Sequence, residues 1–140
     1  MRVVIDTNIW ISYLLGSLLH SLDKRILSKE IKVVVSEEML KELTEVSNRP
    51  KFKDIFTAHR MKELFSLLDS YAIVVSPSQK LNVCRDEKDN FLLEVALEGK
   101  ADYLITGDED LLVLNTIYST RIIRPKDFDN ILKSEEMNSH

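Results

Sequence analysis

Short apolar runs rich in valine and isoleucine alternate along the chain with longer helix-like stretches, and this alternation restricts the fold more than any other feature. Four runs are predicted strands: residues 2–5, 32–35, 103–105 and 121–123. Residues 72–75 are a candidate fifth strand. Because these runs are apolar after their first residue, without polar alternation, they predict strands covered on both faces. Strands separated by helices indicate right-handed β-α-β crossovers, so we predict an α/β fold with a parallel sheet.

The stretches between the strands carry helical periodicity and recognisable helix ends. The predicted helices span residues 9–15, 17–28, 37–47, 51–56, 58–70, 87–97 and 126–132. Ser36 is a good N-cap for the third helix, and Pro50 ends that helix because the residue before a proline disfavours helical geometry. Gly99 is a natural C-cap, and Pro125 suits a first helical turn.

The length and composition indicate one domain of ordinary globular type. The 140 residues show no repeat and no internal linker, so we predict a single domain over residues 1–133 and a polar tail over 134–140. Asp6 interrupts the first apolar run, which argues against a secretory signal, and no run approaches the roughly 20 apolar residues of a membrane span. The single cysteine, Cys84, fits a reducing compartment, so we expect a cytoplasmic protein.

Acidic residues follow two predicted strands, at the end of the sheet where α/β proteins bind ligands. Asp6 comes directly after the first strand, and Asp108 comes shortly after residues 103–105. Two more acids can be placed by helix geometry at about 100° per residue. Glu42 lies at the edge of the apolar stripe of its helix, and Asp89 falls within the apolar arc of helix 87–97.

The other polar residues of these two helices occupy different positions. On helix 37–47, Glu38 and Glu45 lie further round toward solvent than Glu42. On helix 87–97, three side chains share the remaining polar face: Asn90, Glu94 and Glu98.

Buried carboxylates that lie together indicate a cation. An ionised carboxylate is costly to bury unless it is paired or binds a metal, and several together raise one another's pKa. Carboxylates suit Mg²⁺ or Mn²⁺, whereas the scattered His20, His59 and His140 and the lone Cys84 do not favour zinc. Acidic clusters with such cations perform phosphoryl transfer and phosphodiester hydrolysis.

Each acid also has a purely structural interpretation. Asp6 could cap the following helix, Glu42 could be a surface glutamate, and Asp108 could be a turn residue. Asp86 and Asp89 could be acids favoured by the dipole of their helix. The residues alone therefore predict an acidic site in an α/β domain and leave its chemistry open.

Several segments resemble the PIN-domain family in order and spacing. The resemblance lies in VIDTN at residues 4–8, LKEL at 40–43, CRDEKDNFLLEVAL at 84–97 and GKADYLITGDEDLL at 99–112. Two more segments, SNRPKF at 47–52 and IIRPKDF at 122–128, resemble the toxin components of prokaryotic toxin–antitoxin pairs, the VapC-like ribonucleases. Together these segments cover nearly the entire chain.

The resemblance implies a three-layer α/β/α sandwich around a central parallel sheet, with Mg²⁺- or Mn²⁺-dependent cleavage of RNA. It assigns the four acids to Asp6, Glu42, Asp89 and Asp108, of which Asp6, Asp89 and Asp108 hold the metal. Asp86 is the alternative third acid. In toxin pairs the family also implies a cognate antitoxin that covers the site, and often a homodimer.

The resemblance extends to supporting residues and leaves the RNA-binding surface open. Asn8 and Thr106 match polar residues that orient acids or water, and Asp110 would support the fourth acid or bind a second metal. Basic residues near the helical arm and the third acid are candidates for RNA contacts: Arg49, Lys51, Lys53, Arg60, Lys62, Arg85 and Lys88. Ordinary solvated side chains are the alternative for each of them.

Three other functions compete with that of a ribonuclease. An aspartate-nucleophile phosphatase usually needs a second acid two residues after the first, where this chain has Asn8. A receiver domain needs paired acids after its first strand and a phosphoacceptor after a central strand, and neither is present. A catalytically silent PIN domain that acts as an RNA- or protein-binding scaffold remains the alternative, although all four acids are intact.

Overall fold

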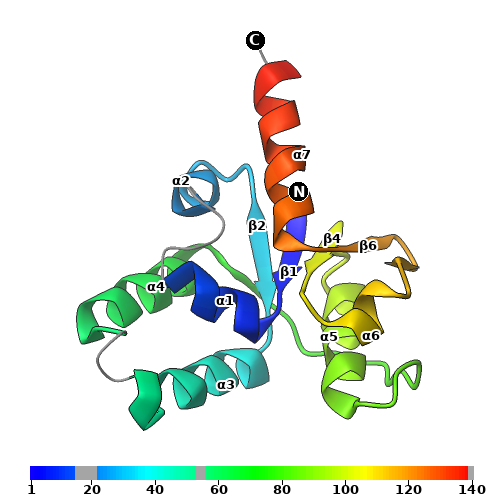
Figure 1. The fold of residues 1–140 in the computed structure, drawn as a ribbon, viewed down its shortest axis with the longest axis horizontal. Coiled ribbons are helices and arrows are strands. Elements are labelled where there is room, and N and C mark those ends of the chain that lie inside the picture. The colour runs from blue at the N-terminus through cyan, green and yellow to red at the C-terminus, as the bar shows by residue number, and fades with distance from the viewer. Residues whose placement is uncertain (15–21, 53–55, 139–140) are drawn as a thin grey trace.

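The computed structural model describes residues 1–14, 22–52 and 56–138, with side chains up to Glu135. Within these ranges a six-stranded sheet has the order β3-β2-β1-β4-β6-β5 (Figure 1). The strands are β1 (Arg2–Ile5), β2 (Lys32–Val35), β3 (Ile73–Val74), β4 (Tyr103–Ile105), β5 (Thr116–Ile117) and β6 (Thr120–Ile123). All neighbouring strands pair in parallel except β5, which pairs antiparallel with β6. The predicted parallel sheet is confirmed.

Helices cover both faces of this sheet, as the apolar strands predicted. The helices are α1 (Thr7–Leu14), α2 (Leu22–Leu27), α3 (Glu37–Ser47), α4 (Ala58–Tyr71), α5 (Glu87–Glu98), α6 (Glu109–Leu112) and α7 (Pro125–Asn138), with a 3-10 turn at Pro50–Phe52. In Figure 1, α1, α2 and α4 lie to one side of the central strands, and α5 and α6 lie to the other. The fold is the expected three-layer α/β/α sandwich.

Successive residues of β1 face different cores, which explains why this strand lacks polar alternation. Val3 and Ile5 belong to a core that also contains Trp10 of α1 and Phe128 of α7. Val4 belongs to the opposite core, which α5 and α6 cover. Because all three strand residues are fully buried, a polar side chain at any of them would be costly.

Several helix ends agree with their predicted capping residues. The Ser36 hydroxyl accepts a hydrogen bond from the Met39 backbone N–H at 3.1 Å, at the start of α3. Gly99 is the C-cap of α5, but its φ of −82° is ordinary, and the left-handed conformation falls on Lys100 with φ 51°. The glycine is needed for a close approach, because a Cβ at position 99 would lie 2.4 Å from Val34 Cγ1.

We predict that Gly99→Ala destabilises the protein by about 1–3 kcal/mol, because the buried Val34 side chain on β2 must move to accept the added methyl group. Gly107→Ala is the matched control, since a Cβ there meets nothing within 4 Å. Chemical denaturation of both variants measures the difference. Equal free energies of unfolding would show that the contact between α5 and β2 relaxes without cost.

Some predicted element bounds were wrong. The predicted helix 126–132 begins at Pro125 and continues to Asn138, so most of the predicted polar tail is the end of α7. The predicted helix 51–56 is represented by the 3-10 turn Pro50–Phe52, and residues 53–55 lie outside the described part of the chain, as do residues 15–21 of the first two predicted helices. β5 and α6 were missed because two and four residues are too few to show a period. In the described ranges, no helix has the length and apolar character needed to cross a bilayer.

Candidate active site

The carboxyl ends of β1 and β4 lie side by side and bring the first and fourth predicted acids to one place. Ile5 pairs with Ile105, and the Asp6 backbone N–H donates to the Ile105 carbonyl at 3.0 Å. The fully buried Thr106 links the two acids: its hydroxyl donates to Asp6 Oδ2 at 2.8 Å and accepts from the Asp108 backbone N–H at 3.1 Å. Thr106 therefore links the Asp6 side chain to the Asp108 backbone.

A group of three carboxylates forms where α5 and α6 begin. One oxygen each from Asp89, Asp108 and Asp110 lies within 4.8 Å of the other two. Asp89 is 5% exposed in the first turn of α5, Asp108 is partly buried, and Asp110 is exposed. The metal set predicted from the resemblance was Asp6, Asp89 and Asp108, so this closest grouping contains Asp110 in place of Asp6.

The surroundings of Asp89 favour its neutral form in the absence of a cation. Burial, a hydrogen bond with the Asp108 side chain and the nearby negative charges raise the pKa of Asp89 to about 7. Burial also raises the pKa of Asp6, although the hydrogen bond from Thr106 acts in the opposite direction. A divalent cation would offset both the burial and the repulsion of these carboxylates, and their hard oxygen atoms suit such an ion. The residues present therefore fit a divalent metal centre.

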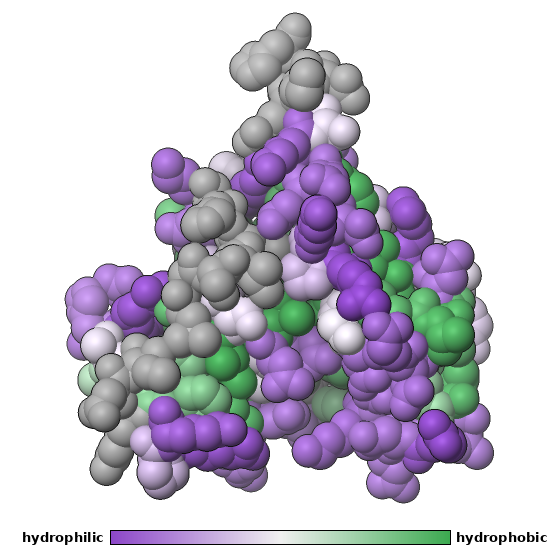
Figure 2. All heavy atoms as spheres, in the orientation of Figure 1, coloured by the Kyte–Doolittle hydropathy of each residue, from purple (hydrophilic) through white to green (hydrophobic). Residues whose placement is uncertain are grey.

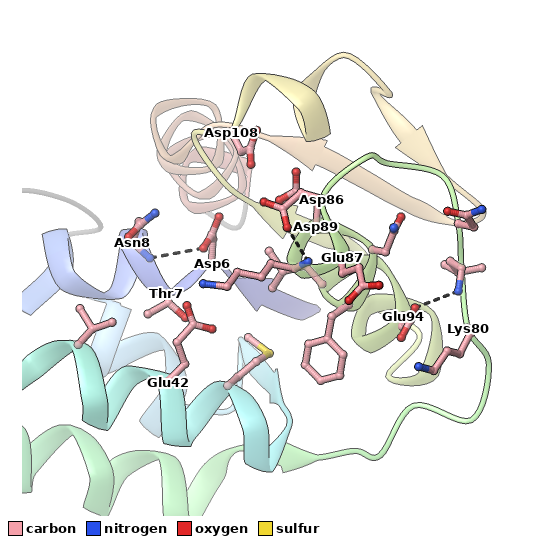
Figure 3. A pocket seen from close by; sticks show the side chains of 18 of the residues that line it. Asp6, Thr7, Asn8, Glu42, Lys80, Asp86, Glu87, Asp89, Glu94 and Asp108 are labelled. Carbon is pink, nitrogen blue, oxygen red and sulfur yellow. Dashed lines mark hydrogen bonds between the residues drawn. The ribbon is translucent and has the colours of Figure 1, made fainter.

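The predicted acids border one cavity of about 740 Å³ (Figure 3). Its lining includes Asp6, Asp89 and Asp108 on one side and Glu42 of α3 on the other, whereas Asp110 is not part of it. In Figure 3 the Glu42 carboxylate lies on the Asp6 side of its helix. Glu45 is exposed and does not line the cavity, so helix geometry correctly separated it from Glu42.

Three acids make helix-capping contacts, of which the structural interpretation predicted that of Asp6. Asp6 accepts a hydrogen bond from the Asn8 backbone N–H at 3.4 Å, and Asp108 accepts one from the Asp110 backbone N–H at 2.9 Å. Asp86 is the exposed N-cap of α5 and accepts from the Lys88 backbone N–H at 2.9 Å. A carboxylate has two oxygens, so capping and metal binding are compatible. Because Asp86 is exposed and Asp89 is buried beside Asp108, the geometry favours Asp89 as the third acid.

The polar face of α5 has a role that sequence reasoning missed. Asn90, Glu94 and Glu98 share this face, as predicted, and they hold the segment that precedes α5. The Asn90 amide oxygen accepts from the backbone N–H groups of Val83 and Cys84, at 3.0 and 2.8 Å, and its NH₂ group donates to the Cys84 carbonyl at 2.9 Å. The Glu94 and Glu98 carboxylates accept from the backbone N–H groups of Leu81 and Ser78, each at 2.9 Å. The i, i+4, i+8 spacing of these three residues, after a stretch without regular structure, was the sequence signal that could have indicated these contacts.

We predict that Asn90→Ala destabilises the protein by about 2–3 kcal/mol, because it removes three hydrogen bonds between α5 and the segment before it. Asn90→Asp keeps an accepting oxygen, but it loses the donor to the Cys84 carbonyl and buries a charge beside Asp89, so it should lose stability as well. Denaturation gives the stabilities, and limited proteolysis near Val83 tests whether this segment is released. Wild-type resistance to proteolysis in Asn90→Ala would contradict the assigned role.

The basic residues predicted to contact RNA lie in different places. Arg49, two residues after α3, and Lys88 on α5 line the cavity, and so does Lys80, which was not predicted. Lys51 is exposed with its ammonium 5.0 Å from the centre of the Phe52 ring. Arg85 is exposed but does not line the cavity, and Lys53 lies outside the described residues. Their roles in RNA binding stay predictions.

Comparisons with known proteins agree with this geometry. The family model of the PIN domain matches residues 2–110, a range that contains all four predicted acids. The chain is also 37% identical over 119 residues to the uncharacterized protein MJ1680 of Methanocaldococcus jannaschii, a match that covers 81% of this chain and 75% of that protein. Since the family match spans well over half of the chain and agrees with the observed fold, this protein belongs to the PIN domain family.

Proposed function

We propose that this protein is a metal-dependent endoribonuclease that hydrolyses RNA phosphodiester bonds with Mg²⁺ or Mn²⁺. PIN domains are generally metal-dependent nucleases, and an acidic cluster is present in this chain. The observation that carries the proposal is the buried Asp89 beside Asp108, with Asp6 tied to the same strand ends through Thr106. A buried group of carboxylates at the ligand-binding end of a parallel sheet is costly to keep without a cation.

Each acid would have a distinct role. Asp6, Asp89 and Asp108 would hold the main metal, and Asp110 would support Asp108 or bind a second ion. The bound cation would lower the pKa of the attacking water and stabilise charge on the phosphate. Glu42, across the cavity, would orient that water or accept its proton.

The proposed biological setting is a toxin–antitoxin pair. The segments at residues 47–52 and 122–128 support it, because they resemble the toxin subgroup of the family. A cognate antitoxin would then cover the cavity, and the protein would form a homodimer. Co-expression with the protein encoded beside it tests this setting: the pair should copurify, and cleavage should fall in the complex.

The nuclease itself is tested with a pool of short labelled RNAs incubated with EDTA, Mg²⁺ or Mn²⁺, beside the Asp6→Asn variant. Cleavage that needs metal and is lost in Asp6→Asn supports the proposal. A protein that neither cleaves nor binds Mn²⁺ would be a silent scaffold. Binding of Mn²⁺ without cleavage would direct the search to other substrates, including DNA, in the same assay.

We predict that Glu42→Gln lowers the cleavage rate by about 100-fold, because the amide cannot accept a proton from water. Glu45→Gln is the matched control, since Glu45 lies on the same helix and is exposed outside the cavity. Single-turnover cleavage of one RNA by both variants measures the effect. If the two variants cleave equally fast, Glu42 has no part in the reaction.

A further inference from the structure

The catalytic cavity has an apolar part that metal binding does not explain. We propose that this part, here called the apolar subsite and formed by Met39, Val46, Leu81 and Phe91, binds one nucleobase of a single-stranded nucleic acid. The inference rests on the proposed nuclease function and adds the feature of the substrate that the site would recognise.

On α3, two residues of the apolar subsite lie on the same helix face as the acid Glu42. Met39, Glu42 and Val46 line the cavity from α3, at a spacing that keeps them on one side of the helix, and Arg49 lines it from two residues beyond the last residue of α3. Along the helix Glu42 thus lies between two apolar side chains, and Arg49 follows just after the helix ends. Met39 and Val46 are 5% and 8% exposed, so they form the floor of the subsite, and a base that rests on them would place its own phosphate near the acids and the arginine.

Phe91 supplies an aromatic ring on the opposite side. It lies on α5, two residues after Asp89, and it lines the cavity although it also packs against the core. Its side chain is half-buried, whereas Leu92 and Leu93, the next residues of the helix, are buried. Unpaired bases commonly stack on such rings, and this stacking is tolerant of base identity.

The wall that contains Leu81 is fixed before any ligand binds. The Leu81 backbone N–H donates to the carboxylate of Glu94, which is 9% exposed, and Asn90 holds the two residues that follow Asn82. Figure 3 shows Lys80 and Glu94 on this side of the cavity and Glu42 on the α3 side. A wall held by buried side chains is preorganised, so little ordering cost would accompany binding.

Size and charge favour a nucleotide over a metal-bound phosphate alone. The cavity of about 740 Å³ falls in the range of roughly 300–1,000 Å³ that encloses small organic ligands. Lys80, Lys88 and Arg49 line it, and no ion pair involving them is found among the described residues. They can therefore bind the phosphates on either side of the stacked base. A paired base cannot leave its helix without cost, so a single strand is the fitting substrate.

Neutral nucleosides test the subsite without any need for cleavage. Adenosine, guanosine, cytidine and uridine are titrated separately into the metal-free protein, and the methyl signals of Met39, Val46 and Leu81 are followed by NMR. We expect at least one nucleoside to shift these three signals together and to leave the methyl signals of α2 and α7 unchanged. Shifts elsewhere, or none with any nucleoside, would overturn the proposal and leave an apolar wall that faces a protein partner.

Two aromatic-to-leucine variants then separate the subsite from the metal centre. Phe91→Leu keeps an apolar side chain but removes the ring, and we expect nucleoside affinity to fall about tenfold with Mn²⁺ affinity unchanged. Tyr118→Leu is the matched control, because Tyr118 is 68% exposed and does not line the cavity. Equal nucleoside affinity in both variants would overturn the proposal. If the wild type neither cleaved RNA nor bound Mn²⁺, the proposed function itself would be contradicted.

Discussion

Replacing Asp89 with asparagine is expected to abolish metal-dependent cleavage and, at the same time, to stabilise the metal-free protein above neutral pH. The amide has nearly the shape of the carboxyl group but carries no charge, so it cannot replace an anionic ligand. Burial beside Asp108 raises the pKa of Asp89 to about 7, so above that pH the wild type holds an ionised carboxylate in an unfavourable place. Asparagine removes this cost, which we expect to be of the order of 2–4 kcal/mol.

The sign of the pH dependence makes this prediction specific. The pKa of Asp89 is higher in the folded state than its ordinary value of 3.8, so the folded wild type binds an extra proton between about pH 4 and 7. The wild type therefore loses stability as the pH rises through this window, and the asparagine variant does not. The two proteins should have similar stability near pH 4 and differ most near pH 8, as denaturation at each pH would measure.

Asp86→Asn is the control, because Asp86 precedes Asp89 by three residues, is exposed, and caps α5 in a way that asparagine reproduces. Its stability should stay near that of the wild type at every pH, and cleavage should persist. If Asp86→Asn abolished cleavage and Asp89→Asn did not, the third acid would be Asp86.

A buried acid whose removal stabilises the fold indicates a function, because the acid lowers the stability of the fold and does not contribute to it. Asp102 gives a contrast within the same chain: this exposed acid accepts a hydrogen bond from the Arg2 backbone N–H at 2.8 Å and so helps to hold β1 beside β4. Removal of Asp102 should weaken the protein slightly, and removal of Asp89 should strengthen it.

The sheet could be predicted from the sequence because a strand that is buried on both faces requires consecutive apolar residues. Val33 and Val34 of β2 face opposite cores and are both fully buried, so apolar residues are required at each position. β5 was missed for a related reason. It is a two-residue edge strand with its Thr116 exposed, so its residues do not have to be apolar. Pairing with β6, and not burial, defines that strand.

The acids could be predicted in part because strand order and helix phase limit where their side chains lie. β1 and β4 are neighbours, so Asp6 and Asp108 had to end at the same edge of the sheet. The grouping of Asp110 with Asp89 could not be predicted, because it depends on the short helix α6 and its capping by Asp108. The spacing of Asn90 with Glu94 and Glu98 indicated a shared helix face, but the partners of Asn90 could not be predicted, since they lie in a segment without a period of its own.

The affinity for Mn²⁺ is expected to rise steeply between about pH 5 and 7 and then to level off. Below pH 7 the folded protein carries a proton in the Asp89–Asp108 pair, and a cation must displace that proton before both carboxylates can bind it. The affinity should therefore increase by close to tenfold per pH unit in this window, or about 30–100-fold in total. With ordinary carboxylates, which ionise near pH 4, the affinity would be nearly constant over the same range.

Calorimetry in buffers of different ionisation enthalpy measures this effect directly, because it counts the protons released as Mn²⁺ binds. Close to one proton should be released near pH 5.5 and almost none near pH 8.5, with circular dichroism as the check that the protein stays folded. Glu45→Gln should give the same curve as the wild type, since that exposed side chain lies outside the cavity. A constant affinity with no proton release near pH 5.5 would mean that the ligands are ionised before the metal arrives. In that case the burial of Asp89 would serve the fold, and the metal centre would have to be sought among the exposed acids.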